Sequence, residues 1–358
     1  MSERPLSAER DLNGLMRLAR AALPGGVSGL LALLLGLVLL FSALRPQSFP
    51  TYGTVQSMMF QLPELGLLAL AMVVPLISGG LNLAIIATTN QCALLMAWIM
   101  TSLAPAGAGS PEVALAVAVA LLAGLALATA IGLGTGLLVA TMGVHPILVT
   151  LGTMSLIDGV SIWLTRGTVI SGFPAAFQWL GNGIVLGVPV PFILLALAAC
   201  VMGLVLTRTS FGIGVHMVGS NLAATRYSGI DTRRVIVGVY TLSSVLCFVA
   251  ACLMMARFNS ASAGYAQSYL LVTILAAVLG GVDPMGGFGR ISGLMLALVV
   301  LQVISSGCNL LGLSQHLTLA IWGLTLIAVM GVKFLVVPWL AERRAQRSQP
   351  RAQGKGTA

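Results

Sequence analysis

Apolar runs long enough to cross a lipid bilayer follow one another along almost the whole chain. A transmembrane helix needs about 20 mostly apolar residues, and runs close to that length recur from residue 27 to residue 337. Charged residues make up only 8% of the chain, whereas a soluble domain has about 25%. Such a chain has too little polar surface to cover a water-soluble core. The sequence therefore predicts an all-α, polytopic integral membrane protein.

The pattern predicts about ten transmembrane helices. The expected spans are residues 27–44, 58–78, 84–104, 113–141, 146–165, 189–207, 235–256, 270–282, 292–308 and 317–337. The fourth is long, which predicts tilt or a break, and the eighth is short enough to be a broken or re-entrant helix. One transmembrane domain is thus expected at 27–337, between an N-terminal tail at 1–26 and a disordered C-terminal tail at 338–358.

Positive charges give the chain an orientation. With ten spans both termini lie on one side, and placing them in the cytoplasm also places the loop 208–234 there. Of the 18 lysines and arginines, only Arg45, Arg166 and Arg257 then fall outside. This follows the positive-inside rule, so we predict a multi-pass protein of the bacterial inner membrane with both termini cytoplasmic. Because the basic residues lie between apolar blocks, their partner is membrane lipid rather than nucleic acid.

The loop 208–234 is the longest polar segment between two spans, and it predicts a short basic helix of its own. Ser220 or Asn221 can cap a helix through Arg226 or Tyr227, and Gly229 can end it. A helical loop is a candidate docking surface for a cytosolic partner, or a helix that lies on anionic lipid. The residues assigned to docking are Ser220, Asn221, Ala224, Thr225, Arg226, Ser228, Gly229 and Asp231.

Two Gly-Gly pairs, Gly79-Gly80 and Gly280-Gly281, interrupt the apolar runs. Non-helical backbone at membrane depth is tolerated only where it is buried in protein or lines a watery cavity. Paired interruptions in the two halves of a chain point to a translocation site. The alternative is that both pairs only end helices at the cytoplasmic interface.

Polar side chains within the spans are further candidates for a translocation path. Asp158 is the only acidic residue deep in a predicted span, and pairing with a nearby serine or threonine is its favoured structural alternative. Glu64, near the outer end of its span, is interpreted as interfacial. The residues assigned to the path are Gly79, Gly80, Asn82, Asn90, Gln91, Asp158, Gly280, Gly281 and Asn309. For each polar member, interhelical hydrogen bonding is the alternative.

Several function classes lose support. The cysteines and histidines do not have metal-ligand spacing, and no catalytic constellation supports a membrane enzyme. An ion-coupled secondary transporter is disfavoured because charge within the spans is scarce. The second glycine cluster lacks the Lys-Ser/Thr that follows the glycines of a phosphate-binding loop. If ATP drives transport, another chain must therefore bind it, and we expect no cofactor in this chain.

Five segments resemble, in the same order, motifs of the ribose/xylose-type permeases, the monosaccharide branch of the binding-protein-dependent ABC importers. They are ISGGLNLA, VHPILVTLGTMSLIDGVSIWLTRG, GSNLAATRYSGIDTRRV, LAAVLGGVDPMGGFGRISG and GCNLLGLS. Together they cover roughly residues 60 to 335. The resemblance implies a permease subunit that imports a monosaccharide or sugar-like solute. A polyol, a nucleoside or a furanone signal stays open as the solute.

The resemblance also implies partners. It implies a second permease copy, identical or not, cytosolic ATPase subunits that bind ATP and Mg²⁺, and a periplasmic solute-binding protein. The segment Asn221–Gly229 would be the coupling helix that enters a groove on the ATPase. The chain departs from the family pattern at Asn82, where the motif has Asp, and at Leu222 and Ala223, where the family often has Glu-Glu. The second departure predicts a dedicated ATPase.

Overall fold

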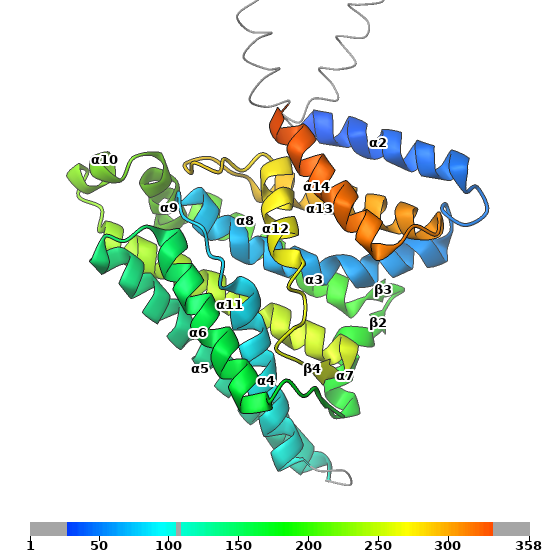
Figure 1. Cartoon of the computed structure of the whole chain (residues 1–358), viewed down its shortest axis with the longest axis horizontal. Coiled ribbons are helices and arrows are strands. Elements are labelled where there is room, and N and C mark those ends of the chain that lie inside the picture. The colour runs from blue at the N-terminus through cyan, green and yellow to red at the C-terminus, as the bar shows by residue number, and fades with distance from the viewer. Residues whose placement is uncertain (1–26, 105–108, 332–358) are drawn as a thin grey trace, which may run out of the picture.

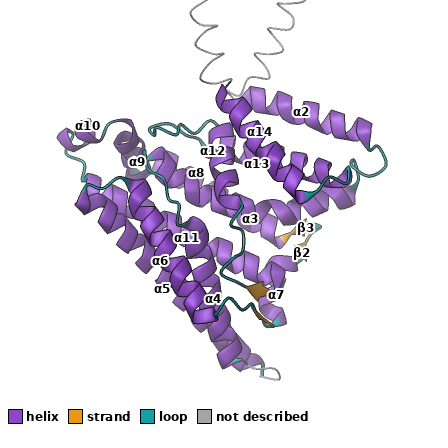
Figure 2. Ribbon diagram, viewed as in Figure 1, coloured by secondary structure: helices purple, strands orange, loops and turns teal. Residues whose placement is uncertain are grey.

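The protein is described by a computed structural model that places residues 27–104 and 109–331. Within these residues the chain forms 13 helices and four strands of two residues each, and Figure 2 shows how completely helices dominate. An all-α membrane architecture is therefore confirmed. The two predicted tails, 1–26 and 338–358, lie outside the described residues, as does the end of the last predicted span.

Each of the ten predicted spans corresponds to a helix. They are α2 (Val27–Leu44), α3 (Tyr52–Ile77), α4 (Ile85–Leu103), α5 (Ser110–Met142), α6 (Pro146–Thr165), α8 (Val190–Arg208), α11 (Thr232–Phe258), α12 (Tyr269–Leu279), α13 (Ile291–Leu310) and α14 (Gln315–Gly331). Among the described residues, α3, α4, α5, α6, α8, α11 and α13 are long and apolar enough to cross a membrane. The long fourth span is one unbroken helix of 33 residues, and α12 is a short helix of 11 residues.

The remaining elements lie at opposite sides of the molecule in Figure 1. On one side are α9 (Ser210–Ser220) and α10 (Leu222–Tyr227). On the other are α7 (Ala175–Asn182) and the antiparallel pair β2 (Ile184–Val185) and β3 (Val188–Pro189). Leu186 and Gly187 both have positive φ, as a tight two-residue hairpin requires. A second antiparallel pair joins β1 (Ile170–Ser171) to β4 (Ser260–Ala261).

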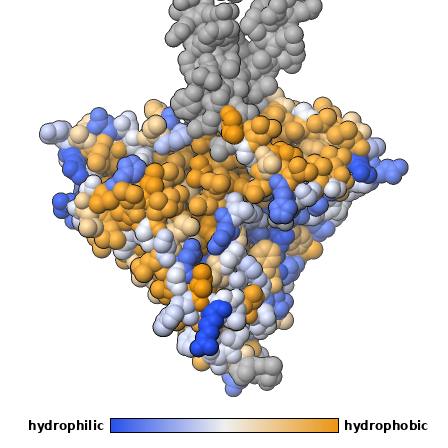
Figure 3. Space-filling view, in the orientation of Figure 1, coloured by the Kyte–Doolittle hydropathy of each residue, from blue (hydrophilic) through white to orange (hydrophobic). Residues whose placement is uncertain are grey.

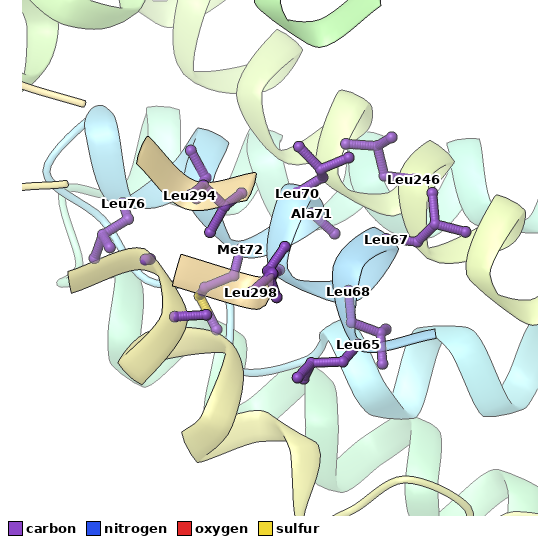
Figure 4. Packing of buried hydrophobic residues seen from close by; sticks show 14 of the residues in the cluster. Leu65, Leu67, Leu68, Leu70, Ala71, Met72, Leu76, Leu246, Leu294 and Leu298 are labelled. Atoms are coloured by element: carbon purple, nitrogen blue, oxygen red, sulfur yellow. The ribbon is translucent and has the colours of Figure 1, made fainter. Parts of the chain in front are cut away.

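Helix α3 forms the centre of the core. Every residue from Leu62 to Ile77 is buried, and the helix packs against α8, α11, α12 and α13. Figure 4 shows its leucines and Met72 against Leu246 of α11 and Leu298 of α13. A helix segment that is apolar on all sides must be surrounded by other elements, so the neighbouring helices separate residues 62–77 of α3 from lipid.

The contact between α5 and α11 depends on small residues. A stripe of alanine and glycine recurs at every fourth position of α5 and is buried: Ala116, Ala120, Gly124, Ala128, Gly132 and Gly136. A Cβ atom on Gly132 would lie 2.6 Å from the Cα of Thr241, and one on Gly136 would lie 2.8 Å from the Cα of Val237. The two backbones therefore touch, as in helix pairs packed through small residues in membranes.

Large apolar side chains cover much of the outer surface. Leu39 on α2, Leu122 on α5 and Leu197 on α8 are all more than half exposed. On the face of the molecule drawn in Figure 3, a broad hydrophobic area lies across the middle and hydrophilic residues lie toward the corners. Exposed apolar area on this scale is unfavourable in water, so the outer surface fits a lipid environment.

We predict that Gly132→Ala destabilises the protein whereas Gly134→Ala does not. The added methyl group on residue 132 overlaps the α11 backbone, and such overpacking costs about 1–3 kcal/mol. Gly134 lies on the same helix, and a Cβ atom there would have nothing within 4 Å, so alanine raises helix propensity by about 0.5–1 kcal/mol. Thermal unfolding of both full-length variants in detergent measures the difference. Equal midpoints would contradict backbone contact between α5 and α11.

Candidate functional site

The short helix α10 projects at one corner of the molecule (Figure 1). Asn221 caps it, because the side-chain oxygen accepts a hydrogen bond from the backbone N–H of Ala224 at 2.9 Å. Gly229 follows the helix in the left-handed conformation, with φ +80°. Asp231 then caps α11 by accepting hydrogen bonds from the backbone N–H groups of Arg233 and Arg234. The predicted helix in this loop, its cap and its end are therefore confirmed.

The residues assigned to docking have different environments. Thr225 is buried and donates its hydroxyl hydrogen to the carbonyl of Asn221 at 2.7 Å. Arg226 is exposed, and its Nε donates to the hydroxyl of Thr232 at 3.1 Å. Ser220, Asn221, Ala224, Ser228, Gly229 and Asp231 are exposed.

The residues assigned to docking did not include the two large apolar residues that α10 exposes. The side chain of Tyr227 is 93% exposed and that of Leu222 is 40% exposed. Both could have been noticed as large apolar residues inside an otherwise polar loop. A helix of six residues is too short for hydrophobic periodicity to reveal its outer face.

Just before α10, three backbone segments lie in contact. The backbone N–H of Gly287 donates to the carbonyl of Ile77 at 2.8 Å, which ties the loop after α12 to the end of α3. A Cβ atom on Gly286 would lie 2.6 Å from the Cα of Gly79, and one on Gly219, in the last turn of α9, would overlap the carbonyl of Ile77. We call Gly79, Gly219, Gly286 and Gly287 the glycine junction. Its close approach requires glycine at 219 and 286, where a Cβ would overlap the neighbouring backbone, and Gly79, Gly286 and Gly287 also have positive φ.

Both predicted Gly-Gly pairs end helices, as their structural alternative stated. After α3, Gly79 has φ +80° and the N–H of Gly80 donates to the carbonyl of Pro75. After α12, Gly281 has φ +84°, while Gly280 packs so closely on α13 that a Cβ would lie 2.7 Å from the Cα of Leu294. These turns are typical helix C-termini. A role in translocation for either pair remains a prediction.

Three polar residues assigned to the path form hydrogen bonds with distant parts of the chain. Asn82, in the loop before α4, donates to the hydroxyl of Ser243 on α11 at 2.9 Å. Asn90 on α4 donates to the carbonyls of Ala263 and Tyr265, in the loop before α12, at 2.8 and 3.0 Å. Gln91 on α4 accepts a hydrogen bond from the hydroxyl of Ser161 on α6. These contacts satisfy polar groups inside the protein, and the bond of Gln91 is the interhelical hydrogen bond that the alternative interpretation predicted.

Asp158 is half-buried on α6 and has no hydrogen bond or ion pair within the described residues. The favoured pairing with a serine or threonine is therefore wrong for this part of the chain. The neighbouring Ile157 is buried, whereas Gly159 and Val160 are exposed. Asp158 thus lies at the edge of the helix face that packs against the rest of the molecule.

The structure corrects the interpretation of Glu64 as interfacial. Its side chain is only 2% exposed, and its Oε1 accepts a hydrogen bond from Nη1 of Arg257 at 2.8 Å. The same nitrogen donates to the carbonyl of Phe60 at 2.7 Å. Sequence analysis missed this ion pair. The available signal was that both residues fall near the outer ends of their predicted spans.

A polar cavity adjoins the ion pair. Its larger part, of about 590 Å³, is lined by residues of α3, α12, α13 and α14, among them Gln61, Ser305 and Trp322. A smaller part of about 210 Å³ shares those three residues and reaches Glu64 and Arg257. Of the residues assigned to the path, Asn309 lines the larger part. The cavity thus lies between the central helix and the three apolar helices nearest the C-terminal end of the described chain.

Comparison with known proteins identifies the architecture. Residues 54–330 match the family described as "Branched-chain amino acid transport system / permease component". The chain belongs to this permease family. The match covers α3 through nearly all of α14, so it includes α10, the glycine junction and the cavity.

Similar proteins show which branch the permease resembles. It is 35% identical to the ribose import permease protein RbsC of Bacillus subtilis (strain 168), over 82% of this chain and 88% of the relative. It is 29% identical to the autoinducer 2 import system permease protein LsrD of Yersinia pseudotuberculosis serotype O:1b (strain IP 31758), over 79% of this chain and 86% of the relative. No solved structure matches the permease. Resemblance to the monosaccharide branch of these importers is therefore confirmed.

We predict that Arg257→Met destabilises the permease more than the double variant Glu64→Gln/Arg257→Met. Removing one partner of a buried ion pair leaves an uncompensated charge, at a cost of about 3–5 kcal/mol. Removing both charges avoids most of that cost. Unfolding midpoints in detergent measure both, and Arg45→Met on an exposed arginine is the control. An Arg257→Met midpoint equal to that of the control would show that the pair contributes nothing.

Proposed function

We propose that this chain is the transmembrane permease subunit of an ATP-driven ABC importer, which moves a monosaccharide or sugar-like solute inward across the inner membrane. The family match over residues 54–330 carries the proposal. The names of the ribose and autoinducer 2 import permeases support a sugar-like solute. ATP hydrolysis, with its bound Mg²⁺, belongs to a separate cytosolic subunit. A polyol, a nucleoside or a furanone signal remains the alternative solute, and an ion-coupled transporter the less favoured alternative mechanism.

In this proposal α10 is the surface that the ATPase contacts. Tyr227 and Leu222 are exposed apolar residues on a short helix whose backbone is fixed by caps at both ends. Tyrosine is among the residues that most often dominate protein interfaces, because a buried ring contributes a large contact area. A groove on the ATPase that buries Tyr227 would therefore supply much of the binding free energy.

The docking of α10 also fixes the proposed orientation. If α10 lies in the cytoplasm, both termini do as well, and α7 with the β2–β3 hairpin lies on the periplasmic side. A solute-binding protein would dock on that side. A second permease copy, identical or homologous, would complete the transporter. This orientation agrees with the distribution of basic residues along the chain.

The glycine junction offers a route from α10 to the cavity. Two residues separate Gly219 from the start of α10, and Gly219 touches the end of α3. Gly286 and Gly287 lie in the loop that follows α12. Both α3 and α12 contribute residues to the cavity wall. Because packed backbones move as units, a displacement of α10 by the ATPase would move the two helices that line the cavity.

We expect ATP-dependent uptake in proteoliposomes that contain the permease, its ATPase and its solute-binding protein. Tyr227→Ala should weaken binding of the ATPase by about thirtyfold or more, because loss of an interface anchor costs about 2 kcal/mol or more, and the amount of ATPase that co-purifies should fall accordingly. Uptake should fall in parallel.

Leu186→Ala is the matched control, since Leu186 is fully exposed on the hairpin at the opposite side. It should leave the amount of co-purified ATPase unchanged. Uptake that continues without the ATPase and follows a proton or sodium gradient would overturn the importer proposal. ATPase retention unaffected by Tyr227→Ala would move the docking surface away from α10.

A second comparison tests the glycine junction. Gly286 and Gly281 both have positive φ, so alanine strains the backbone similarly at either position. Only at Gly286 would the new Cβ also meet another backbone, whereas nothing lies within 4 Å at Gly281. We expect Gly286→Ala to raise the number of ATP molecules hydrolysed per solute imported. The same ratio in both variants would exclude the junction from coupling.

A further inference from the structure

We propose that the cavity beside Glu64 and Arg257 is a transit site for an uncharged, polyhydroxylated ring of monosaccharide size. This inference rests on the proposed function, because it names the place in the permease where the imported solute is held. The residues that carry it are the ion pair and Trp322, and Ser305 in the same wall is the position of the test. All of them lie within the described chain.

The dimensions of the cavity suit a small solute. Its two parts measure about 590 and 210 Å³ and share Gln61, Tyr269, Ser305 and Trp322. Ligand sites in proteins typically occupy about 300–1,000 Å³. The wall combines the aromatic rings of Phe258, Tyr269 and Trp322 with amide, hydroxyl and charged groups. That combination fits a sugar ring, which has apolar C–H faces and a polar rim.

The ion pair presents hydrogen-bonding groups that the protein leaves unused. Arg257 binds both Glu64 and the carbonyl of Phe60 through Nη1. Within the described residues its other guanidinium nitrogens and the Oε2 of Glu64 have no hydrogen-bond partner. The Arg257 side chain remains 21% exposed in a part of the molecule where Glu64 is almost fully buried. A donor group and an acceptor oxygen therefore lie side by side, as two neighbouring hydroxyl groups require.

The charges of the pair select against ionic solutes. A solute anion near Arg257 would also be repelled by the carboxylate of Glu64. A solute cation near Glu64 would be repelled by the guanidinium of Arg257. Among the other lining residues, His316 and Tyr269 are the titratable ones. With Glu64 and Arg257 balanced, the wall favours a neutral solute with many hydroxyl groups over a phosphorylated one.

Trp322 supplies the second, independent observation. Its indole Nε1 is buried and has no hydrogen-bond acceptor within the described residues, although Trp322 lines both parts of the cavity. A buried donor without a partner costs free energy and calls for an explanation. As placed, this nitrogen has almost no accessible surface. A turn of the indole toward the cavity would let a solute hydroxyl accept this hydrogen bond while the ring covers an apolar face of the solute.

Another cavity of similar size shows the contrast. About 510 Å³ lies between α4 and α6, and its lining is mainly apolar, with Leu94, Trp98 and Leu164 among its residues. It has no ion pair. That space suits an acyl chain or a partner side chain better than a polyhydroxylated ring.

The test uses the full-length permease assembled with its ATPase. Ser305→Cys places a thiol in the cavity wall, and Cys200→Ser removes the exposed native cysteine, since the other four are buried. D-ribose and D-xylose should slow modification of the new thiol by a small methanethiosulfonate reagent. D-ribose 5-phosphate at the same concentration should not.

Trp322→Phe in the same background keeps an aromatic ring but removes the N–H donor. We expect the sugar concentration that gives half protection to rise about tenfold, the effect of losing one good hydrogen bond. Trp98→Phe, which alters the apolar cavity, is the matched control and should leave protection unchanged. If the cavity held only water and no solute, the sugars and D-ribose 5-phosphate would have the same effect on the rate of thiol modification.

The outcomes separate this inference from the proposed function. Absence of protection by both sugars, in preparations where the ATPase still co-purifies and uptake is ATP-dependent, would overturn the transit site alone. Equal protection by D-ribose 5-phosphate would overturn the preference for an uncharged solute. Loss of ATP-dependent uptake in the unsubstituted permease would instead remove the importer proposal itself.

Discussion

The arrangement of this permease depends on direct backbone contact at the glycine junction. The end of α3, the last turn of α9 and the loop after α12 can meet because Gly219 and Gly286 carry no side chains. Their contact includes the hydrogen bond from Gly287 to the carbonyl of Ile77. A side chain at Gly219 or Gly286 would push the backbones at this junction apart. The position of the proposed docking helix is thereby fixed relative to the core.

The same principle recurs between α5 and α11, where a stripe of alanine and glycine replaces large side chains. In lipid, apolar side chains gain little by leaving their solvent, so close van der Waals contact and hydrogen bonds must hold helices together. The hydrogen bonds of Asn82 and Asn90 fit this account, because each joins the region of α4 to a distant part of the chain. The central helix α3, by contrast, packs against bulky side chains of its neighbours, as Figure 4 shows.

Much of the fold could be predicted because lipid limits the length and composition of each span. Asn221 and Gly229 also predicted the bounds of α10, since caps act locally. The ion pair was missed for the opposite reason. Glu64 and Arg257 are 193 positions apart, and no local pattern connects them. Similarly, a polar residue in a span shows that a partner is needed without showing whether that partner is Ser243, another backbone group or a solute.

Helix α3 connects the two functional regions that we propose. Its C-terminal end lies in the glycine junction, and its N-terminal half contributes Gln61 and Glu64 to the cavity. A change at either end therefore acts on the other, and such coupling is reciprocal: if docking of the ATPase alters solute affinity, solute alters ATPase affinity by the same factor. A neutral solute bound beside a balanced ion pair moves no net charge across the membrane. The membrane potential then contributes nothing to moving the solute itself, and in the proposed importer the free energy for accumulation would come from the ATPase through α10.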